Sequence, residues 1–348
     1  MQQMRGVWLT GHGGFDRLEV RIDIPRPEPG PGEVLVRVAA AGVNNTDINT
    51  RLAWYSKGEG ASDDASWASE PIRFPRIQGI DVCGRVAVVG AGVSVERIGE
   101  RVLIEPCLRE AGGRELQRPW FLGSECDGGF AEYVVVASRH ACPIRSDLDD
   151  VALASFPCSY STAENLLQRA QVRSGEQVLV TGASGGVGSA AIQLAVMRGA
   201  EVIAVTSPAK AGQLLRLGAR ETLARDDSLI DTLGRDSVDA VIDLVAGPRF
   251  PGLLEVLRPG GRYAVSGAIG GPLVQLDVRT LYLKDLSLFG CTVLDPQVFP
   301  DLVGYIEQGK IRPLVARTFP LEQIVEAQQA FLSKQHVGKL VLTVAARD

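Results

Sequence analysis

The glycine-rich segment at residues 178–195, VLVTGASGGVGSAAIQLA, constrains the fold more than any other part of the chain. It opens with Val178, Leu179 and Val180, an apolar run typical of a strand buried on both faces of a parallel sheet. Four glycines follow at once: Gly182, Gly185, Gly186 and Gly188. Glycine permits a tight turn and a close approach of the backbone to an anion, and a helix that begins there points unpaired N–H groups at that anion. The segment therefore predicts a dinucleotide site.

The residues around this turn support the same interpretation. Residues 189–198 are typical of an apolar helix that stops at Gly199, and residues 201–206 predict a second buried strand at the spacing of a Rossmann unit. Ala183 stands at the first position of the strict G-x-G-x-x-G fingerprint, so the prediction depends on this context as well as on the glycines. The turn residues expected to contact the cofactor are Ser184, Gly185, Gly186, Val187 and Gly188.

The end of the second strand is expected to select the cofactor. NAD sites usually place an acid there for the ribose 2′-hydroxyl, whereas a 2′-phosphate favours small polar and cationic groups. This chain has Thr206, Ser207 and Lys210 at that point and no acid, and Arg225 follows the next predicted strand. We therefore predict NADP(H), contacted by Ser207, Lys210 and Arg225. For the two cations, a solvated surface position is the alternative.

The composition is that of an ordinary globular protein. The chain has 348 residues, a length that is sufficient for two domains, each with its own core. Its formal net charge is −5, and 45% of its residues are hydrophobic. It shows no basic stripe, no membrane-spanning apolar run and no signal-peptide core. The six cysteines are dispersed, as expected of reduced thiols. We expect a cytoplasmic protein with no nucleic-acid or membrane partner.

The sequence pattern divides the chain into two kinds of structure. Residues 1–150 contain short extended runs separated by Gly and Pro, as in a small β-rich domain. Residues 151–295 alternate helices and strands, which implies a doubly wound parallel sheet. Residues 296–348 hold two amphipathic helices and a final strand, assigned to the first domain. The stretches 54–74 and 107–128 look irregular, and the first is either a mobile excursion or a lid.

Four motifs resemble the medium-chain dehydrogenase/reductase superfamily over nearly the whole chain. They are GEVLVRVAAAGVNNTD at 32–47, QGIDVCGRVAVVG at 78–90, DGGFAEYVVV at 127–136 and the GASGGVG turn. The resemblance implies an α/β protein with two domains. A GroES-like β-rich catalytic domain would comprise residues 1–150 and 296–348, and a Rossmann NADP-binding domain with a doubly wound parallel sheet would comprise residues 151–295.

The chain departs from the zinc alcohol dehydrogenases of this superfamily at the metal ligands. Those enzymes carry Cys, His and a Gly-His-Glu motif at positions that are occupied here by Asn44, Asn45, Gly79, Ile80 and Asp81. Cys158 occupies a third ligand position of the catalytic zinc. The structural-zinc lobe of these enzymes has four closely spaced cysteines, and this chain has only Cys107 and Cys126 there. One thiolate and one carboxylate do not complete the usual zinc site. No zinc is therefore expected.

The sequence is similar in more detail to the zinc-free quinone oxidoreductase branch. That branch often reads N-x-x-D-x-x-x-R-x-G-x-Y, and Asn44, Asp47, Arg51 and Tyr55 fall in register, with Ala53 in place of the glycine. The resemblance implies that Asn44 lies beside the nicotinamide ribose. It also implies that Tyr55 faces the substrate, where its hydroxyl polarises a carbonyl or relays a proton. Asp47 is expected to orient its neighbours rather than act as a base. The alternatives are a turn-capping Asn44 and a Tyr55 in the core.

Further cofactor contacts follow from the resemblance alone. Thr162 matches a helix position on the nicotinamide side, with Tyr160 lining the cleft, and Lys339 matches a cation that reaches the pyrophosphate. The carboxyl ends of two later strands, where open α/β sheets bind ligands, add Leu244, Val245, Ser266 and Gly267.

These features predict an NADPH-dependent oxidoreductase that reduces quinones or α,β-unsaturated carbonyls by hydride transfer without zinc. An electron-poor enone needs only hydrogen-bond donors for the charge that develops on its carbonyl, whereas an alcohol needs a group that lowers its pKa. Two alternatives stay open: an atypical metal-dependent alcohol dehydrogenase using Cys158 and Asp81, and an NADPH-binding protein with little turnover. The expected partners are a small-molecule quinone or enone and, through an apolar edge strand at 286–294, a second copy in a homodimer.

Overall fold

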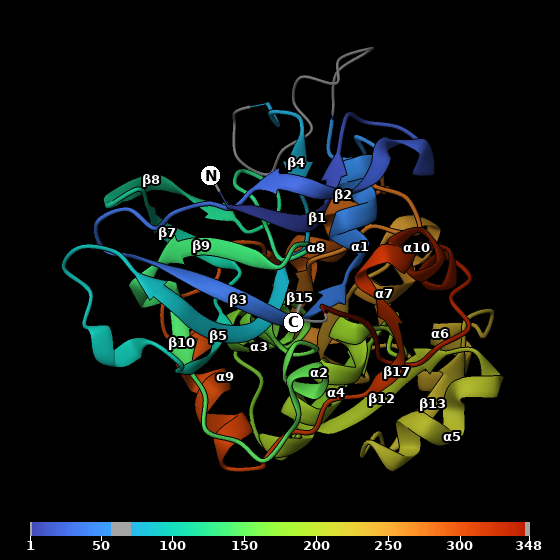
Figure 1. Cartoon of the computed structure of the whole chain (residues 1–348). Coiled ribbons are helices and arrows are strands. Elements are labelled where there is room, and N and C mark those ends of the chain that lie inside the picture. The colour runs from blue at the N-terminus through green and yellow to red at the C-terminus, as the bar shows by residue number, and fades with distance from the viewer. Residues whose placement is uncertain (1, 57–70, 345–348) are drawn as a thin grey trace. The chain divides into compact units, whose positions relative to one another are not determined.

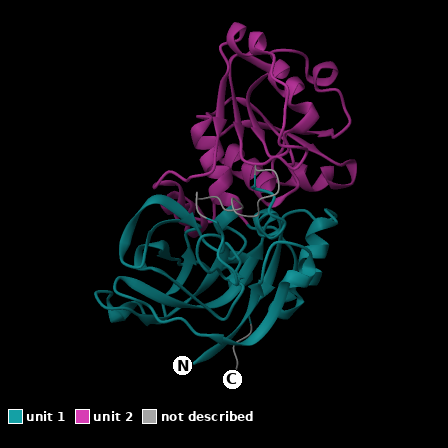
Figure 2. Ribbon diagram, turned by 90° about the horizontal axis from the view of Figure 1, so that it is seen from above, with its two compact units in different colours: residues 1–158, 313–348 teal, residues 159–312 magenta. Residues whose placement is uncertain are grey.

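The structure, a computed structural model, describes residues 2–56 and 71–344 (Figure 1). It forms two compact units, residues 1–158 with 313–348 (unit 1) and residues 159–312 (unit 2), coloured separately in Figure 2. Unit 2 ends later in the chain than residue 295, and it therefore includes α9 (Val298–Glu307), whose Phe299 and Leu302 are fully buried. Most of the stretch at 54–74, including the part expected to form a lid, lies outside the described residues.

Unit 1 is a β-rich domain built around the long strand β3 (Glu33–Val43), which pairs with β5, β9 and β18 in one seven-stranded sheet. Val34, Leu35 and Val36 are fully buried, because this strand is covered on both faces. The other strands of this sheet are β5 (Asp81–Val89), β6 (Arg101–Ile104), β9 (Tyr133–Ala137), β10 (Ala141–Pro143), β17 (Val315–Pro320) and β18 (Lys339–Thr343). A second sheet holds β1 (Gln3–Leu9), β2 (Leu18–Pro25) and β4 (Arg76–Ile77). The helices are α1 (Asn45–Arg51), α2 (Asp150–Leu153) and α10 (Ile324–Leu332).

A hairpin of β7 (Cys107–Ala111) and β8 (Arg114–Phe121) fills much of the stretch 107–128. The expectation of an irregular segment there is wrong. Gly112 and Gly113 form the two-residue turn with φ of 59° and 69°, and positive φ at both positions is what a type I′ hairpin turn requires. The Gly-Gly pair between two extended runs was therefore the local signal for this hairpin.

Unit 2 carries the predicted parallel sheet, in the order β13-β12-β11-β14-β15-β16, and Figure 2 shows helices on both sides of it. Its strands are β11 (Gln177–Val180), β12 (Glu201–Thr206), β13 (Glu221–Ala224), β14 (Val238–Asp243), β15 (Leu257–Val265) and β16 (Ser287–Gly290). Its other helices are α3 (Pro157–Arg169), α4 (Gly186–Met197), α5 (Pro208–Arg216), α6 (Leu229–Leu233), α7 (Phe250–Val256) and α8 (Val278–Leu283). The expected α/β class, with a GroES-like domain and a Rossmann sheet, is confirmed.

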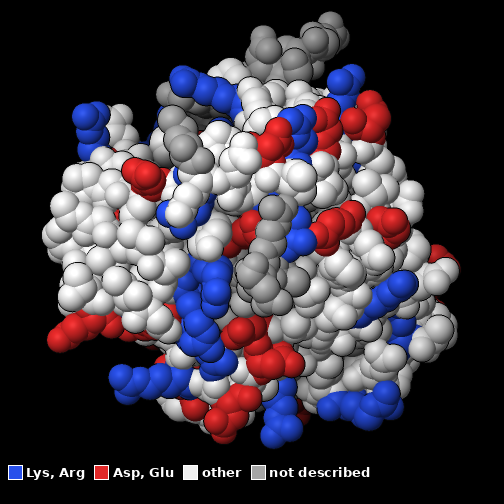
Figure 3. All heavy atoms as spheres, viewed as in Figure 1, with Lys and Arg blue, Asp and Glu red and all other residues white. Residues whose placement is uncertain are grey.

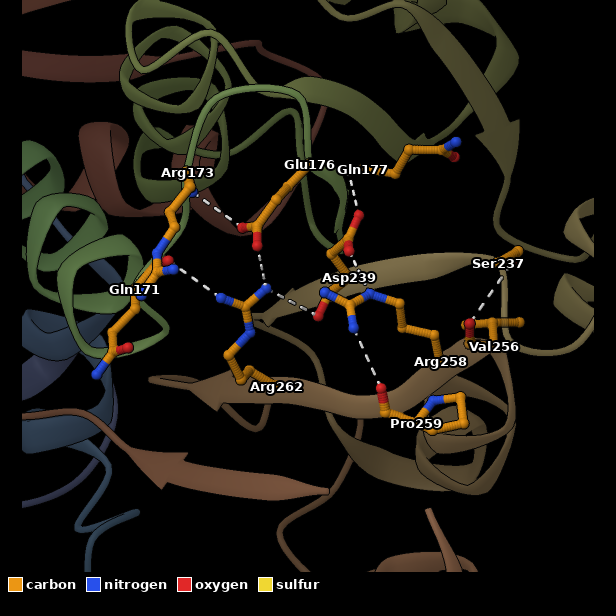
Figure 4. A network of polar contacts seen from close by, with 10 residues as sticks. All are labelled: Gln171, Arg173, Glu176, Gln177, Ser237, Asp239, Val256, Arg258, Pro259 and Arg262. Carbon is orange, nitrogen blue, oxygen red and sulfur yellow. Dashed lines mark hydrogen bonds and ion pairs between the residues drawn. The ribbon is translucent and has the colours of Figure 1, made fainter. Parts of the chain in front are cut away.

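A polar network ties together the amino ends of three central strands of this sheet (Figure 4). Arg262 of β15 donates to Glu176 Oε1 at 2.7 Å and to the carbonyl oxygen of Gln171 at 3.0 Å. Asp239 of β14 accepts from the Gln177 N–H at 2.8 Å. These contacts hold the strands together at their amino ends. The glycine-rich turn lies at the other end of the sheet, because it follows the carboxyl end of β11.

Charges of both signs are interspersed on the face drawn in Figure 3. Across residues 2–56 and 71–344, no helix has the length and apolar character needed to cross a membrane.

Candidate active site

The glycine-rich turn of unit 2 links β11, which ends at Val180, to α4, which begins at Gly186. Gly182 adopts φ of 57°, a conformation that glycine reaches without strain. A Cβ at Gly188 would lie 2.4 Å from the Gly182 carbonyl oxygen, so the first turn of α4 can pack on the loop only with glycine at this position. The turn and the start of α4 contain the expected contacts Ser184, Gly185, Gly186, Val187 and Gly188. Unpaired N–H groups at the start of a 12-residue helix suit a pyrophosphate.

The carboxyl end of β12 gathers the groups expected to bind a 2′-phosphate. Ser207 is the N-cap residue of α5, and Lys210 lies in the first turn of that helix with 9% of its surface exposed. Burial, together with the nearby charge of Arg225, lowers the pKa of Lys210. Thr206 is 2% exposed, and its hydroxyl has no hydrogen-bond partner in the part of the chain that the structure describes. An anion close to Lys210 and Arg225 would relieve the repulsion between these two cations.

The segment that carries Arg225 is held by Arg249, a residue that the sequence analysis missed. The Arg249 guanidinium donates to the carbonyl oxygen of Arg225 and, at 2.7 Å, to that of Asp227. An arginine distant in sequence gives no local sign of this contact.

The loop after β14 is shaped by Asp243, which is fully buried and was also missed. Its carboxylate accepts the N–H groups of Val245 at 2.9 Å and Ala246 at 3.1 Å. It also accepts hydroxyl hydrogen bonds from Thr181 and Tyr263, both at 2.5 Å. Ala246 has φ of 54°, which residues with a side chain rarely adopt, and the hydrogen bond from its N–H to Asp243 helps to hold it there. The acid that closes the otherwise mostly apolar run VDAVID was the available signal.

The two expected ligand loops at the carboxyl ends of β14 and β15 pack against each other. A Cβ at Gly267 would lie 2.7 Å from the Leu244 carbonyl oxygen, and Gly270 donates its N–H to the carbonyl oxygen of Val245 at 2.7 Å. The two loops thus pack side by side at the carboxyl end of the sheet, the same end as the glycine-rich turn. They carry the expected contacts Leu244, Val245, Ser266 and Gly267.

Unit 1 contains a buried polar cluster at the start of α1 and β5. Asp81 is fully buried, Lys339 is 3% exposed and Asn44 is 6% exposed. The Lys339 ammonium donates to Asp81 Oδ2 at 2.7 Å and to Asn44 Oδ1 at 2.5 Å, and Asn44 Nδ2 donates to Asp81 Oδ2 at 2.8 Å. The Cys158 N–H donates to Asp81 Oδ1 at 2.5 Å. Both carboxylate oxygens of Asp81 are therefore hydrogen-bonded.

This cluster shows where the Lys339 side chain lies, and its expected contact with the pyrophosphate stays a prediction. Its ammonium lies inside unit 1, ion-paired with Asp81. The physical reason is that Asp81 is fully buried and needs a cation and hydrogen-bond donors where it sits.

Asp47 and Tyr55 lie on and beside α1, near the cluster. Asp47 Oδ2 accepts the Asn44 N–H at 2.8 Å, so Asn44 is the N-cap residue of α1 and Asp47 orients it. Burial raises the pKa of Asp47 to about 7. The half-buried Tyr55 donates its hydroxyl hydrogen to Thr46 Oγ1 at 3.2 Å and accepts from Asn49 Nδ2 at 3.4 Å.

The two expected contacts on α3 have different environments. Thr162 is half-buried. Tyr160 is 1% exposed, and its hydroxyl donates to the carbonyl oxygen of Arg312 at 2.7 Å and accepts from Gln193 at 2.9 Å. Tyr160 is therefore buried within unit 2, where its hydroxyl is held by Gln193 and Arg312, and its place beside a cleft stays a prediction.

The residues at the zinc-ligand positions do not fit a catalytic zinc. Asn44, Asp81 and the backbone N–H of Cys158 are brought together, but the Lys339 ammonium bonds to both polar side chains. A cation in contact with the single carboxylate opposes a second cation there, and an amide is a poor zinc ligand. Elsewhere in residues 2–56 and 71–344, no group of three or more His, Cys, Asp or Glu gathers to hold a metal.

A GroES-like unit joined to a Rossmann unit with a dinucleotide-type turn defines a class of two-domain oxidoreductases. Residues 30–146 match the family model of the alcohol dehydrogenase GroES-like domain, and residues 186–308 match that of the zinc-binding dehydrogenases. The chain belongs to the medium-chain dehydrogenase/reductase superfamily.

Its relatives carry several activities. The chain is 31% identical to a quinone oxidoreductase of Lama guanicoe over 97% of both chains. It is 30% identical to an acryloyl-coenzyme A reductase of Metallosphaera sedula, over 98% of this chain and 100% of the other. A putative alcohol dehydrogenase from Sinorhizobium meliloti, known from a crystal structure, shares 44% sequence identity with this chain. The two structures match with a TM-score of 0.90 over 99% of this chain and 97% of that one.

Proposed function

We propose that this oxidoreductase uses NADPH to reduce quinones or α,β-unsaturated carbonyl compounds without zinc. One observation carries the proposal: an ammonium takes part in the buried Asn44–Asp81 cluster, where zinc-dependent members hold their metal. An alcohol at this site would lack the Lewis acid that lowers its pKa, whereas reduction of a polarised double bond needs only hydrogen-bond donors. The quinone oxidoreductase and acryloyl-coenzyme A reductase relatives support this class of substrate.

The cofactor would be held by unit 2. The glycine-rich turn would take the pyrophosphate, and the end of β12 would take the 2′-phosphate through Ser207, Lys210 and Arg225. The loops after β14 and β15, with Thr162, would contact the nicotinamide half. When bound, NADPH supplies a hydride to the β-carbon of an enone or to a quinone ring.

The residues of unit 1 would act at the nicotinamide ribose and on the substrate. Asn44, fixed by Asp47 and by the cluster, would lie beside the nicotinamide ribose. Tyr55, which accepts a hydrogen bond from Asn49, would turn its single hydroxyl hydrogen from Thr46 Oγ1 to the substrate carbonyl oxygen as negative charge develops there. Water or the Tyr55 hydroxyl would then supply the proton.

The proposal extends to location and assembly. All six cysteines are free thiols, which suits the cytoplasm. In unit 2, β16 lies at the edge of the sheet, paired with β15. Large apolar side chains are exposed on β16 and in the segments before and after it in the sequence: Leu273, Val278, Tyr282, Leu283, Leu288 and Val293. A second copy of the chain would cover this surface and extend the sheet.

The test is the rate of NADPH and NADH oxidation with a panel of quinones, enones and enoyl thioesters, and the reverse assay with alcohols, on protein whose zinc content has been measured. Turnover of a quinone or enone with NADPH and without metal is expected. Stoichiometric zinc with alcohol oxidation would instead establish a metal-dependent alcohol dehydrogenase. Tight NADPH binding with no turnover across the panel would indicate a binding protein.

A further inference from the structure

A row of aromatic and cationic side chains crosses the main sheet of unit 1. Tyr133 of β9 pairs with Arg37 of β3, and Arg37 pairs with Arg85 of β5. Directly opposite residues on adjacent strands point to the same face, so these three side chains are neighbours there. The Arg26 guanidinium, which follows β2, lies over the Tyr133 ring at 5.4 Å from its centroid. Figure 3, in the same view as Figure 1, shows Lys and Arg atoms gathered over β3 and β5.

The three guanidinium groups of this row have no acidic partner within the protein. Among the residues that the structure describes, no hydrogen bond or ion pair reaches the side chains of Arg26, Arg37 and Arg85. The Nε atom of Arg26 is buried without an acceptor. Like charges directly opposite each other, as in Arg37 and Arg85, destabilise a sheet. An anion held between them would remove this repulsion.

The three arginines line a cavity of about 490 Å³ in unit 1, which we call the arginine cavity. This volume is within the range of small-molecule sites. Two acids also line it, but each already has a cation. Glu132 accepts the Arg5 N–H at 2.7 Å and is ion-paired with the Arg5 guanidinium. Asp150 lies 3.6 Å from Arg101. The charge that is left over in the wall of the arginine cavity is therefore positive.

The spacing of these cations indicates the kind of anion that fits. A guanidinium binds a phosphate or carboxylate group through two parallel N–H···O hydrogen bonds. Arg26 lies over Tyr133, and Tyr133 and Arg85 stand on strands that flank β3 on either side. Adjacent strands are about 4.8 Å apart, so the cations are spread over roughly 10 Å. A ligand with two or more anionic groups matches this spread better than a single phosphate ion does.

We propose that the arginine cavity binds a small molecule with two or more phosphate or carboxylate groups, held by Arg26, Arg37 and Arg85. The cavity shares no residue with the contacts proposed for the cofactor or the substrate. The inference therefore does not depend on which reaction the protein catalyses.

The test is isothermal titration calorimetry of the full chain at low ionic strength, where exposed charges are least screened. The probes are tripolyphosphate and citrate, with inorganic phosphate as the ion that has a single anionic group. We expect tripolyphosphate or citrate to bind at least about tenfold more tightly than inorganic phosphate, because a second anionic group adds charged hydrogen bonds. The tighter of the two shows whether the site prefers phosphate or carboxylate groups.

The informative variant is Arg37→Gln with Arg85→Gln, which removes two exposed charges and is expected to fold. It should bind the preferred probe about 10- to 100-fold more weakly. The matched control is Arg114→Gln with Arg317→Gln, which removes two exposed charges of unit 1 outside the cavity. Lys210→Glu alters the proposed nucleotide site. Both of these should bind the probe as the wild type does, and thermal unfolding checks that every variant is folded.

Four results would overturn the inference. The first is that neither tripolyphosphate nor citrate binds to the wild type at millimolar concentration. The second is wild-type affinity in the variant that lacks Arg37 and Arg85. The third is an equal loss in the control pair, which would show a response to net charge alone. The fourth is a loss that only Lys210→Glu produces, which would place the anion in the nucleotide site.

Discussion

The Thr181 hydroxyl donates a 2.5 Å hydrogen bond to Asp243, and so joins the residue after β11 to the last residue of the neighbouring strand β14. The same hydroxyl oxygen accepts the Leu244 N–H at 2.9 Å. One side chain thus connects the glycine-rich turn, which is proposed to hold the pyrophosphate, to the loop after β14, which is proposed to contact the nicotinamide half of the cofactor.

Thr181→Val should lower the free energy of unfolding by about 1–3 kcal/mol, because it leaves a buried carboxylate and a backbone N–H each short of one partner. Thr206→Val is the matched control at the end of the next strand. Its hydroxyl is buried without a partner among the described residues, so its loss should cost no stability. Chemical denaturation measures both, and equal losses would contradict the role given to Thr181.

Lys210→Glu should raise the KM for NADPH about 10- to 100-fold and leave kcat nearly unchanged, since it removes a phosphate contact that is present in both the ground state and the transition state. The KM for NADH should change little. Arg216→Glu, which reverses an exposed charge at the end of the same helix, serves as the control. Equal effects of Lys210→Glu on the two nucleotides would argue against a 2′-phosphate contact.

Gly188→Ala and Gly185→Ala should separate folding from binding. The added Cβ lies 2.4 Å from a carbonyl oxygen at residue 188 and 3.5 Å from one at residue 185. We expect the first variant to lose about 2 kcal/mol or more of stability through strain. The second should keep its stability but bind NADPH more weakly, because its methyl group would stand where the backbone approaches the pyrophosphate. Denaturation and nucleotide titration together distinguish the two.

Asp47 should make stability fall as the pH rises through neutrality. Its pKa is raised from an ordinary value of 3.8 to about 7 in the folded protein. Between these two values, the folded protein holds a proton that the unfolded chain has released, so stability is highest below pH 4 and is lost as the pH approaches 7. Asp47→Asn removes this dependence. Relative to that variant, the wild type should lose roughly 2–3 kcal/mol between pH 5 and 8, measured by denaturation at each pH. A constant difference would show that Asp47 is ionised throughout.

Leu283→Glu should convert the proposed dimer into a monomer. Leu283 is 70% exposed on α8, which directly precedes the edge strand β16. A buried carboxylate at a shared apolar surface would be costly. Ile22→Glu, at a residue in unit 1 that is 63% exposed, is the control. Analytical ultracentrifugation measures the mass of the wild type and of both variants in solution. A wild type that sediments as a monomer would contradict the proposed dimer.

Local patterns in the sequence predicted much of the fold and only part of the site. The glycine-rich turn, β11 and β12 lie within 30 consecutive residues, so their period and spacing are visible directly. Asp243, Arg249 and Lys339 act through contacts with residues far away in the chain. Lys339 and Asp81 are 258 positions apart, and no local pattern could pair them. The family resemblance gave Lys339 a role, but the buried charge of Asp81 determines where its ammonium lies.

Unit 1 is discontinuous, and this has a consequence for synthesis on the ribosome. Unit 2 is one continuous segment, residues 159–312, and can fold as soon as it emerges. The main sheet of unit 1 must wait for β18, which pairs with β3 almost 300 residues after that strand was made. Until then, Asp81 lacks its ammonium and the exposed edge of β3 is open to other chains. Unit 1, although it is translated first, is therefore the last to complete its fold and the part that most needs protection during translation.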